Sequence, residues 1–342
     1  MQLFFLALSC FCAFAAWHAS DLYPPWFKFQ SEAWAGVALV WLSLAQLWRP
    51  PPTPPVALRQ PDALSLCLLV LPLLASLHVL NSTTIYLGDA ALLTLYSLGA
   101  LLALQLGYLW TAGPDSSRLL NGLCFLLVVS AICSVAEALY QWLLLDGLGH
   151  WVLQIPSSAR PSGNFAQANR MAMHTATGLA GLVWLYRKSM LHISGLALGA
   201  VFLCLGIALT QSRAGLLSAV AILLVAAMLQ RRQACVGVLY VALAVVAALM
   251  FWQLPALSQA LELGAVRTER LALGSRGTLL AGFARSILER PWWGYGPGQI
   301  VHAQFYVVGQ GLPAQVSFWA HHVLLDFALW FGVPAMLVVA AA

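Results

Sequence analysis

Apolar residues in this chain come in long continuous runs, which short polar or proline-rich segments separate. Ten runs approach the roughly 20 residues that a helix needs to cross a bilayer. They lie at about 2–17, 33–48, 62–80, 90–110, 119–145, 171–186, 191–210, 214–230, 234–253 and 317–342. Because these runs do not alternate with polar residues, they favour helices over a membrane β-barrel. The pattern predicts an all-α polytopic membrane protein with about ten transmembrane helices.

The composition agrees with a membrane protein and excludes other classes. The chain is 61% hydrophobic and 8% charged, whereas soluble domains carry roughly 25% charged residues. The excess of basic over acidic residues, 16 against 11, is small and does not indicate nucleic-acid binding. The seven cysteines form no CxxC pair, so they predict neither a disulfide framework nor a metal site.

Basic residues recur at every second loop between the predicted helices. They are Arg49, Arg59, Arg118, Arg187, Lys188, Arg231 and Arg232. By the positive-inside rule these loops and the N-terminus face the cytoplasm. The other loops, at 18–32, 81–89, 146–170, 211–213 and 254–316, then face outward. We therefore expect a multi-pass membrane protein whose second set of loops faces the periplasm or the cell exterior.

Nine of the sixteen lysines and arginines lie on the predicted outer side, against that rule. They are Lys28, Arg160, Arg170, Arg213, Arg267, Arg270, Arg276, Arg285 and Arg290. Arg213 stands at the lip of the apolar run 214–230, where an arginine costs free energy unless it is solvated or paired. It either anchors the helix in the headgroups or binds something anionic. The outer excess of positive charge favours an anionic ligand.

Two outer loops carry polar groups suited to binding. The segment RPSGNFAQANRMA at 160–172 holds Asn164, Gln167 and Asn169, whose amides suit sugar hydroxyls or a peptide backbone; a polar loop that ends in a helix cap is the alternative. In the long loop 254–316, apolar residues from 276 to 289 recur at helical spacing. They predict an amphipathic helix in the interface. Its first residue, Arg276, lies where a helix N-terminus also favours anions.

The last apolar run opens with FWAHHVLLDFALWFGVP. His321 and His322 fall in the first turn of a helix that starts on the outer side. A histidine there titrates near neutrality and can donate or accept protons, although a histidine at a helix end is also often structural. His322 and Asp326 are four residues apart and could pair on one helical face.

Three of these motifs together resemble the core of the bacterial O-antigen ligase family: SRAGLL, SRGTLLAGFARSILERPWWGYGPGQ and AHHVLLDFALWFGVP. His321 matches the family histidine, whereas His322 stands where asparagine is usual and Trp330 where glutamate is common. GNFAQAN resembles the GNFGQPN-type motif of one branch, the pilin-glycosylating O-oligosaccharyltransferases, and Gln167 matches the glutamine of that motif. The resemblance covers roughly residues 155–335.

The resemblance implies a GT-C-like helical fold and a glycosyltransferase of the bacterial inner membrane, with its active site on the periplasmic side. Residues 1–150 would supply N-terminal transmembrane helices, and residues 151–342 the ligase core. The enzyme would transfer an oligosaccharide from undecaprenyl diphosphate to a Ser or Thr hydroxyl of a pilin or another periplasmic acceptor. The chain stops at AMLVVAA, inside a predicted helix, and we expect it to be a truncated piece of a longer protein.

Charge development during that reaction suggests roles for the arginines. Breaking the sugar–phosphate bond builds negative charge on the lipid diphosphate, and guanidinium groups stabilise such charge with bidentate hydrogen bonds. We expect Arg213 and Arg276 to bind the diphosphate, with Arg160 as a third candidate. Because arginines supply the charge, no metal or other cofactor is expected.

The remaining polar candidates would handle the acceptor. His321 would either activate the acceptor hydroxyl or bind the phosphate, and these two roles need opposite protonation states at the start. Gln167 and Asn169 would orient the acceptor or the sugar. Transfer to lipid A–core or polymerisation of O-antigen units uses the same donor and remains open. A transporter of polyprenyl-linked sugars would place polar groups near mid-membrane, where Glu137 is the main candidate.

Overall fold

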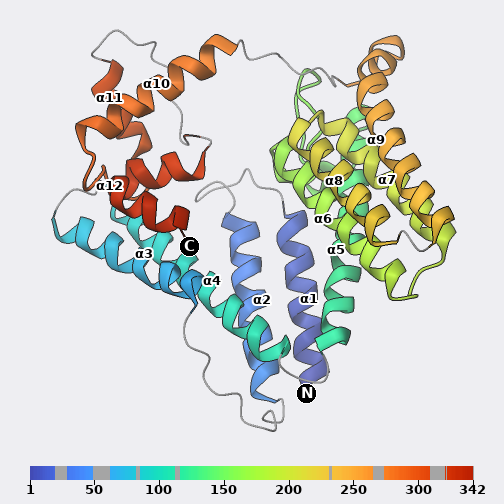
Figure 1. Cartoon of the computed structure of the whole chain (residues 1–342), viewed down its shortest axis with the longest axis horizontal. Helices are drawn as coiled ribbons and strands as arrows, with labels where there is room; N and C mark the ends of the chain where they lie inside the picture. Colours follow the sequence, from blue (N-terminus) through green and yellow to red (C-terminus); the bar gives the residue numbers. More distant parts are fainter. Residues whose placement is uncertain are drawn as a thin grey trace. The chain divides into compact units, whose positions relative to one another are not determined.

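The computed structural model describes residues 1–19, 29–48, 62–81, 85–111, 116–230, 233–264, 273–308, 320 and 322–341. Within these ranges the regular structure is helical and contains no strand (Figure 1). The helices are α1 Gln2–His18, α2 Phe29–Leu47, α3 Ala63–Leu80, α4 Leu87–Thr111, α5 Ser116–Trp142, α6 Ala168–Arg187, α7 Ile193–Thr210, α8 Arg213–Leu229, α9 Ala234–Ala260, α10 Leu273–Glu289, α11 Ile300–Val308 and α12 Val323–Ala341. Two short 3-10 helices, η1 Gly149–Trp151 and η2 Gly163–Phe165, lie between α5 and α6.

Each of the ten predicted spans coincides with a helix, so the all-α polytopic prediction is confirmed. Among the described residues, six helices are long and apolar enough to cross a membrane: α3, α4, α5, α7, α9 and α12. Helices α1 and α8 are apolar but have 17 residues each. The predicted amphipathic helix is α10, which begins at Leu273, before the predicted start at 276, and ends shortly before Pro291. Helix α11 was not predicted, because its nine residues lie within the segment assigned to an outer loop.

The chain folds into two compact units, each with its own packed helices. Unit 1 comprises Met1–Pro50 and Trp110–Thr268, and unit 2 comprises Pro51–Leu109 and Glu269–Ala342. Each unit therefore combines an early and a late part of the sequence. The predicted ligase core, residues 151–342, contributes to both units.

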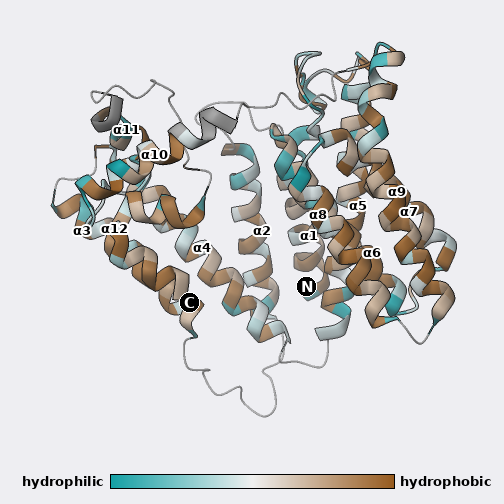
Figure 2. Ribbon diagram, turned by 45° about the horizontal axis from the view of Figure 1, so that its top comes forward, coloured by the Kyte–Doolittle hydropathy of each residue, from teal (hydrophilic) through white to brown (hydrophobic). Residues whose placement is uncertain are grey.

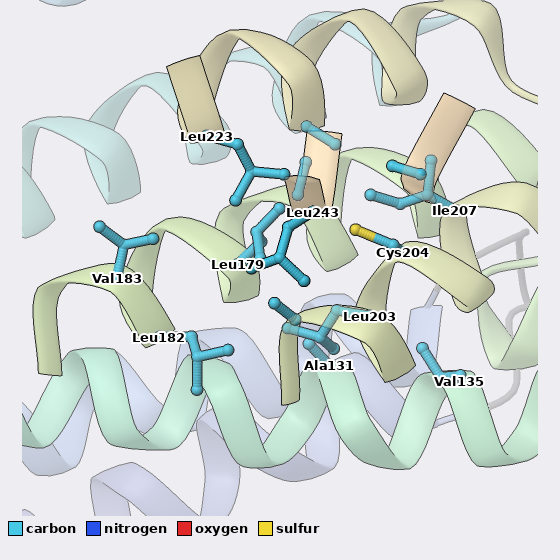
Figure 3. Close-up of a cluster of buried hydrophobic side chains, with 14 of the residues drawn as sticks. Ala131, Val135, Leu179, Leu182, Val183, Leu203, Cys204, Ile207, Leu223 and Leu243 are labelled. Atoms are coloured by element: carbon cyan, nitrogen blue, oxygen red, sulfur yellow. The ribbon is translucent and has the colours of Figure 1, made fainter. Parts of the chain in front are cut away.

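The core of unit 1 forms where α5, α6, α7, α8 and α9 pack together (Figure 3). Small residues let the helices approach closely. A Cβ atom on Gly206 of α7 would lie 2.2 Å from Cγ2 of Val135, and one on Gly178 of α6 would lie 2.4 Å from Cβ of Ala131. Membrane helices use such small residues because tight packing, rather than exclusion of water, holds them together.

The outward faces of these helices are apolar as well. Leu198, Leu217 and Trp252 expose 74%, 69% and 80% of their surface. In Figure 2 the helices are coloured as hydrophobic over most of their length, and hydrophilic residues gather near helix ends and loops. In water each such side chain would cost about 1.5–3 kcal/mol relative to burial, whereas hydrocarbon solvates it. This surface fits a helix bundle that has lipid as its solvent.

Unit 2 contains a broken helix. Inside α12, Gly332 has φ 84° and ψ 172°, and Pro334 follows. Residues 291–296, which we call the aromatic turn, dock on the break: Tyr295 N donates to Leu329 O at 2.7 Å and Gly296 N to Trp330 O at 2.9 Å. Trp330 O needs this donor, because the residue four positions on is Pro334, which has no N–H.

Candidate functional site

Hydrogen bonds from the Gln141 side chain of α5 hold the predicted binding loop, residues 160–170. The Gln141 amide donates to Leu153 O at 2.8 Å and to Gly163 O at 2.9 Å. Its oxygen accepts from Ser162 N and Gly163 N, both at 2.9 Å. All four polar positions of one buried side chain are thus used to fix this 160–170 loop, so its backbone conformation is specified rather than adaptable.

Asn164 is a structural residue of the loop and not a free hydrogen-bonding group. Its Nδ2 donates to His18 O at 2.7 Å and to Trp151 O at 2.8 Å, and its Oδ1 accepts from Leu153 N at 2.8 Å. Asn164 is 2% exposed. The suggestion that Asn164 suits sugar hydroxyls or a peptide backbone is therefore wrong, because protein groups already occupy its amide.

Gln167 and Asn169 differ from Asn164 both in exposure and in hydrogen bonding. Both side chains are exposed at the start of α6. Gln167 occupies the N-cap position without making a side-chain cap hydrogen bond, and neither side chain contacts a polar partner among the described residues. Ala166, just before them, has φ 54° and turns the chain into the helix. The structure thus presents these two amides at the surface, where a ligand can reach them.

Arg160 joins the loop to the turn between α7 and α8. Its Nη1 lies 3.2 Å from Thr210 O and 3.5 Å from Gln211 O. The side chain is half-buried and forms no ion pair within the described part of the chain. Burial lowers the pKa of this guanidinium, but an arginine starts so high that it stays charged at neutral pH. Arg160 therefore adds an uncompensated positive charge to this end of unit 1.

Arg213 is the first residue of α8 and is exposed. Ser212 caps this helix, since its hydroxyl accepts from Gly215 N at 3.2 Å. The starts of α8 and α6 touch: a Cβ atom on Gly215 would lie 2.6 Å from Cβ of Ala172. Two helix N-termini, each carrying a partial positive charge, therefore lie side by side with Arg160 and Arg213. This arrangement is suited to an anion such as a phosphate.

The structure does not describe the side chains of His321 and Arg276, the other two predicted site residues. His321 lies outside the described residues. Arg276 falls in the first turn of α10, in unit 2, but its side chain is outside the described part. The structure thus places Arg160, Gln167, Asn169 and Arg213 at or next to the adjoining starts of α6 and α8 in unit 1. The roles of all six candidate residues remain predictions.

The pairing suggested for His322 and Asp326 is not found. His322 is exposed and makes no ion pair with Asp326 in the described part of the chain. Instead, Asp326 Oδ1 accepts from Ala320 N at 2.8 Å. The carboxylate thereby caps the backbone that leads into α12, a common use for an aspartate near a helix start.

Sequence reasoning missed a polar cluster beneath the loop. Glu137 Oε1 lies 2.6 Å from His18 Nδ1 at the end of α1, and Glu137 Oε2 accepts from Asn164 N at 3.0 Å. Glu137 therefore binds the loop, near the C-terminal end of α5. The available signal in the sequence was a carboxylate within an apolar run. The sequence does not indicate its partner, because His18 is 119 residues away.

Comparisons with known proteins agree with the superfamily predicted from the motifs. The sequence is 28% identical to a general O-oligosaccharyltransferase from Acinetobacter baylyi over 347 residues, which cover 97% of this chain and 59% of that relative. No solved structure shows significant similarity to the chain. Residues 198–340, which include α8 and the Arg213 position, match the protein family described as O-Antigen ligase. Both matches agree with the resemblance to the O-antigen ligase family that the sequence motifs show.

Proposed function

We propose that this chain is part of a glycosyltransferase that moves an oligosaccharide from undecaprenyl diphosphate to a Ser or Thr hydroxyl of a pilin or a similar periplasmic protein. The observation that carries the proposal is that Arg160 and Arg213 lie next to the adjoining starts of α6 and α8, where the exposed amides of Gln167 and Asn169 also lie. One group of side chains is suited to a diphosphate and the other to neutral polar ligands.

The reaction assigns a task to each group. The acceptor oxygen forms a bond to the anomeric carbon of the sugar, and the bond from that carbon to the phosphate oxygen breaks. The electron pair stays on the lipid diphosphate, where Arg213 and Arg160 would stabilise it. The hydroxyl proton passes to a base, for which His321 is our candidate. We expect no metal or cofactor, because guanidinium groups provide the positive charge.

The identity of the acceptor rests on two further supports. The relative with 28% identity is named a general O-oligosaccharyltransferase, and GNFAQAN resembles the motif of the pilin-glycosylating branch. Topology adds that the C-termini of α1, α5 and α7 and the N-termini of α6 and α8 meet at one end of unit 1. The positive-inside rule assigns that end to the periplasm, where a pilin hydroxyl is accessible.

The test uses the complete gene product in membranes with purified undecaprenyl-diphosphate oligosaccharide and a pilin acceptor. Glycosylated pilin is followed by intact mass for the wild type, Arg213→Ala, Gln167→Ala and His321→Ala. Arg187→Ala is the matched control, because Arg187 is an exposed arginine at the opposite end of α6. We expect transfer by the wild type and the control and its loss in the other three variants.

Other outcomes separate the alternatives. Transfer to lipid A–core or to another lipid-linked glycan, without transfer to pilin, would support the proposed donor and contradict the proposed acceptor. Movement of the lipid-linked sugar across the membrane without any covalent transfer, unaffected by His321→Ala, would make the protein a transporter.

A further inference from the structure

A chain of four polar side chains runs beneath the 160–170 loop in unit 1. His18 Nδ1 lies 2.6 Å from Glu137 Oε1, and His18 Nε2 lies 3.1 Å from Ser130 Oγ. Ser130 Oγ in turn lies 2.9 Å from His174 Nε2. The chain therefore links α1, α5 and α6 just below the start of the loop.

One arrangement of tautomers gives each of these three contacts a donor and an acceptor. In it, His174 Nε2–H donates to Ser130 Oγ, the Ser130 hydroxyl donates to His18 Nε2, and His18 Nδ1–H donates to the Glu137 carboxylate. The Glu137 carboxylate is then the final acceptor of the chain.

Glu137 also binds the loop itself. Its Oε2 accepts from Asn164 N at 3.0 Å, and its Oε1 lies 3.4 Å from Asn164 Nδ2. Gly163 has φ 55°, and a Cβ atom there would lie 3.0 Å from Oε2 of Glu137 and 3.2 Å from Ser134 O. The loop backbone therefore lies directly on the carboxylate, and a residue without a side chain is needed for this approach.

Apolar rings enclose the cluster. The ring centroids of Phe14 and His18 are 4.3 Å apart, and those of Trp17 and Phe165 lie 5.1 and 5.0 Å from His174. The side chains of His18 and Glu137 are 12% and 13% exposed. Placing a carboxylate in such surroundings costs free energy unless several donors bind it. Asn164 and His18 are the groups that bind the Glu137 carboxylate.

We propose that Glu137 is a positioning residue for glycosyl transfer: it holds Gly163 and Asn164 so that Gln167 and Asn169 keep the geometry that binds the acceptor or sugar. This inference rests on the proposed function. In this scheme Glu137 does not touch the substrate. It acts through the backbone from Asn164 to Ala166, which leads to Gln167.

The nature of the side chain follows from its donors. One carboxylate accepts hydrogen bonds from two elements, the end of α1 and the loop. A glutamine at this position keeps one oxygen for Asn164 N and turns its NH2 toward His18, which can accept after a change of tautomer. Glu137→Gln should therefore preserve part of the function, and Glu137→Ala should not.

The experiment compares wild type, Glu137→Ala, Glu137→Gln and a matched control, all as the complete protein in lipid nanodiscs. The control is Asn121→Ala, because Asn121 also joins α5 to α6, through a 2.9 Å hydrogen bond from Trp184 Nε1 to its Oδ1. Hydrogen–deuterium exchange is measured for peptides covering 160–170 and, as a reference for overall folding, 193–210. Steady-state transfer gives kcat and KM for the donor.

We expect Glu137→Ala to speed exchange in 160–170 but not in 193–210, and to lower kcat roughly 10- to 100-fold with little change in KM. Glu137→Gln should give an intermediate kcat, and Asn121→Ala should leave loop exchange and kcat near wild type. These results together would support the positioning role.

Three outcomes would overturn it. Exchange in 160–170 that is the same in Glu137→Ala and wild type would show that the carboxylate does not hold the loop. Faster loop exchange with unchanged kcat would show that the loop need not be held. An equal loss in Glu137→Gln and Glu137→Ala, with faster exchange in 193–210, would reduce the role to stability. If the wild type transfers nothing, the proposed function fails, while the exchange comparison still decides whether Glu137 holds the loop.

Discussion

The 160–170 loop of unit 1 and the aromatic turn of unit 2 are both irregular segments that dock against membrane-length helices, but different groups hold them. Side chains of Gln141 and Glu137 and the loop's own Asn164 make the hydrogen bonds that hold the loop. The aromatic turn is bound to α12 by backbone groups: its N–H groups donate to carbonyls of α12, and Pro291 O accepts from Val333 N at 2.7 Å. The loop thus depends on the identity of a few polar residues, and the turn on the absence of side chains at its contacts.

This difference determines how each segment responds to substitutions. A segment bound through side chains can be altered one hydrogen bond at a time, and an isosteric residue can restore part of the binding. A segment bound through its backbone responds mainly to steric change at its glycines. The predictions below use this contrast and run from the largest expected effect to the smallest.

Gly332→Ala in α12 should have the largest effect. Gly332 has φ 84°, and a Cβ atom would lie 2.4 Å from Trp292 O. Because both the backbone conformation and the contact exclude a side chain, we expect a loss of about 3 kcal/mol or more in the free energy of unfolding. Thermal unfolding in detergent would measure it. Gly277→Ala in α10, where nothing lies within 4 Å, is the control and should not destabilise. Equal midpoints for the two variants would contradict the backbone-bound turn.

Asn164→Ala should come next, with a loss of about 3 kcal/mol, because it leaves two carbonyls and one N–H of the loop region without their partner. Asn164→Asp keeps the acceptor oxygen but places a second carboxylate beside Glu137, so we expect it to be at least as harmful. Unfolding midpoints and transfer activity would be measured for both. If Asn164→Asp were as stable as wild type, the expected repulsion between its carboxylate and Glu137 would be contradicted.

Gly206→Ala tests helix packing in the core of unit 1 rather than either segment. The added methyl would meet Val135, so we expect a cost of about 2 kcal/mol. Val135→Ala makes room for it, and the double variant should recover part of that loss. Figure 3 shows Val135 in the cluster that α7 enters. Purely additive losses in a double-mutant cycle would argue against direct contact between the two positions.

Ser212→Ala should have the smallest effect, about 1 kcal/mol, since it removes only the N-cap of α8. Ser212→Asn retains a capping oxygen and should stay near wild type. If the start of α8 binds the diphosphate, Ser212→Ala should also raise KM for the donor more than it changes kcat. Unchanged stability in Ser212→Ala would show that the cap hydrogen bond contributes little.

The helices could be predicted from the sequence because the bilayer requires long apolar runs, and ten of them are present. Helix ends were less predictable. The apolar run at 317–342 suggested a start at 317, whereas α12 begins at Val323, since hydropathy does not record where capping groups such as Asp326 lie. Helix α11 escaped notice because a nine-residue helix inside a long loop has too short a pattern.

The site could be predicted only in part. Arg213 was correctly placed at the lip of a helix, and Gln167 and Asn169 are exposed as expected. Asn164 was misjudged, because its partner His18 is 146 residues away in the sequence. Spacing reveals which residues share a local turn, but contacts between distant helices depend on packing that a single sequence does not display.

The break in α12 has a consequence for movement. If α12 straightened, Val333 N would return to Leu329 O, and Tyr295 N and Pro291 O would lose their partners together. Trp330 O could not be recovered by the helix at all, because Pro334 stands in the place of its donor. The aromatic turn and the two halves of α12 therefore behave as one interlocked body, in which the helix cannot straighten unless the turn is released first.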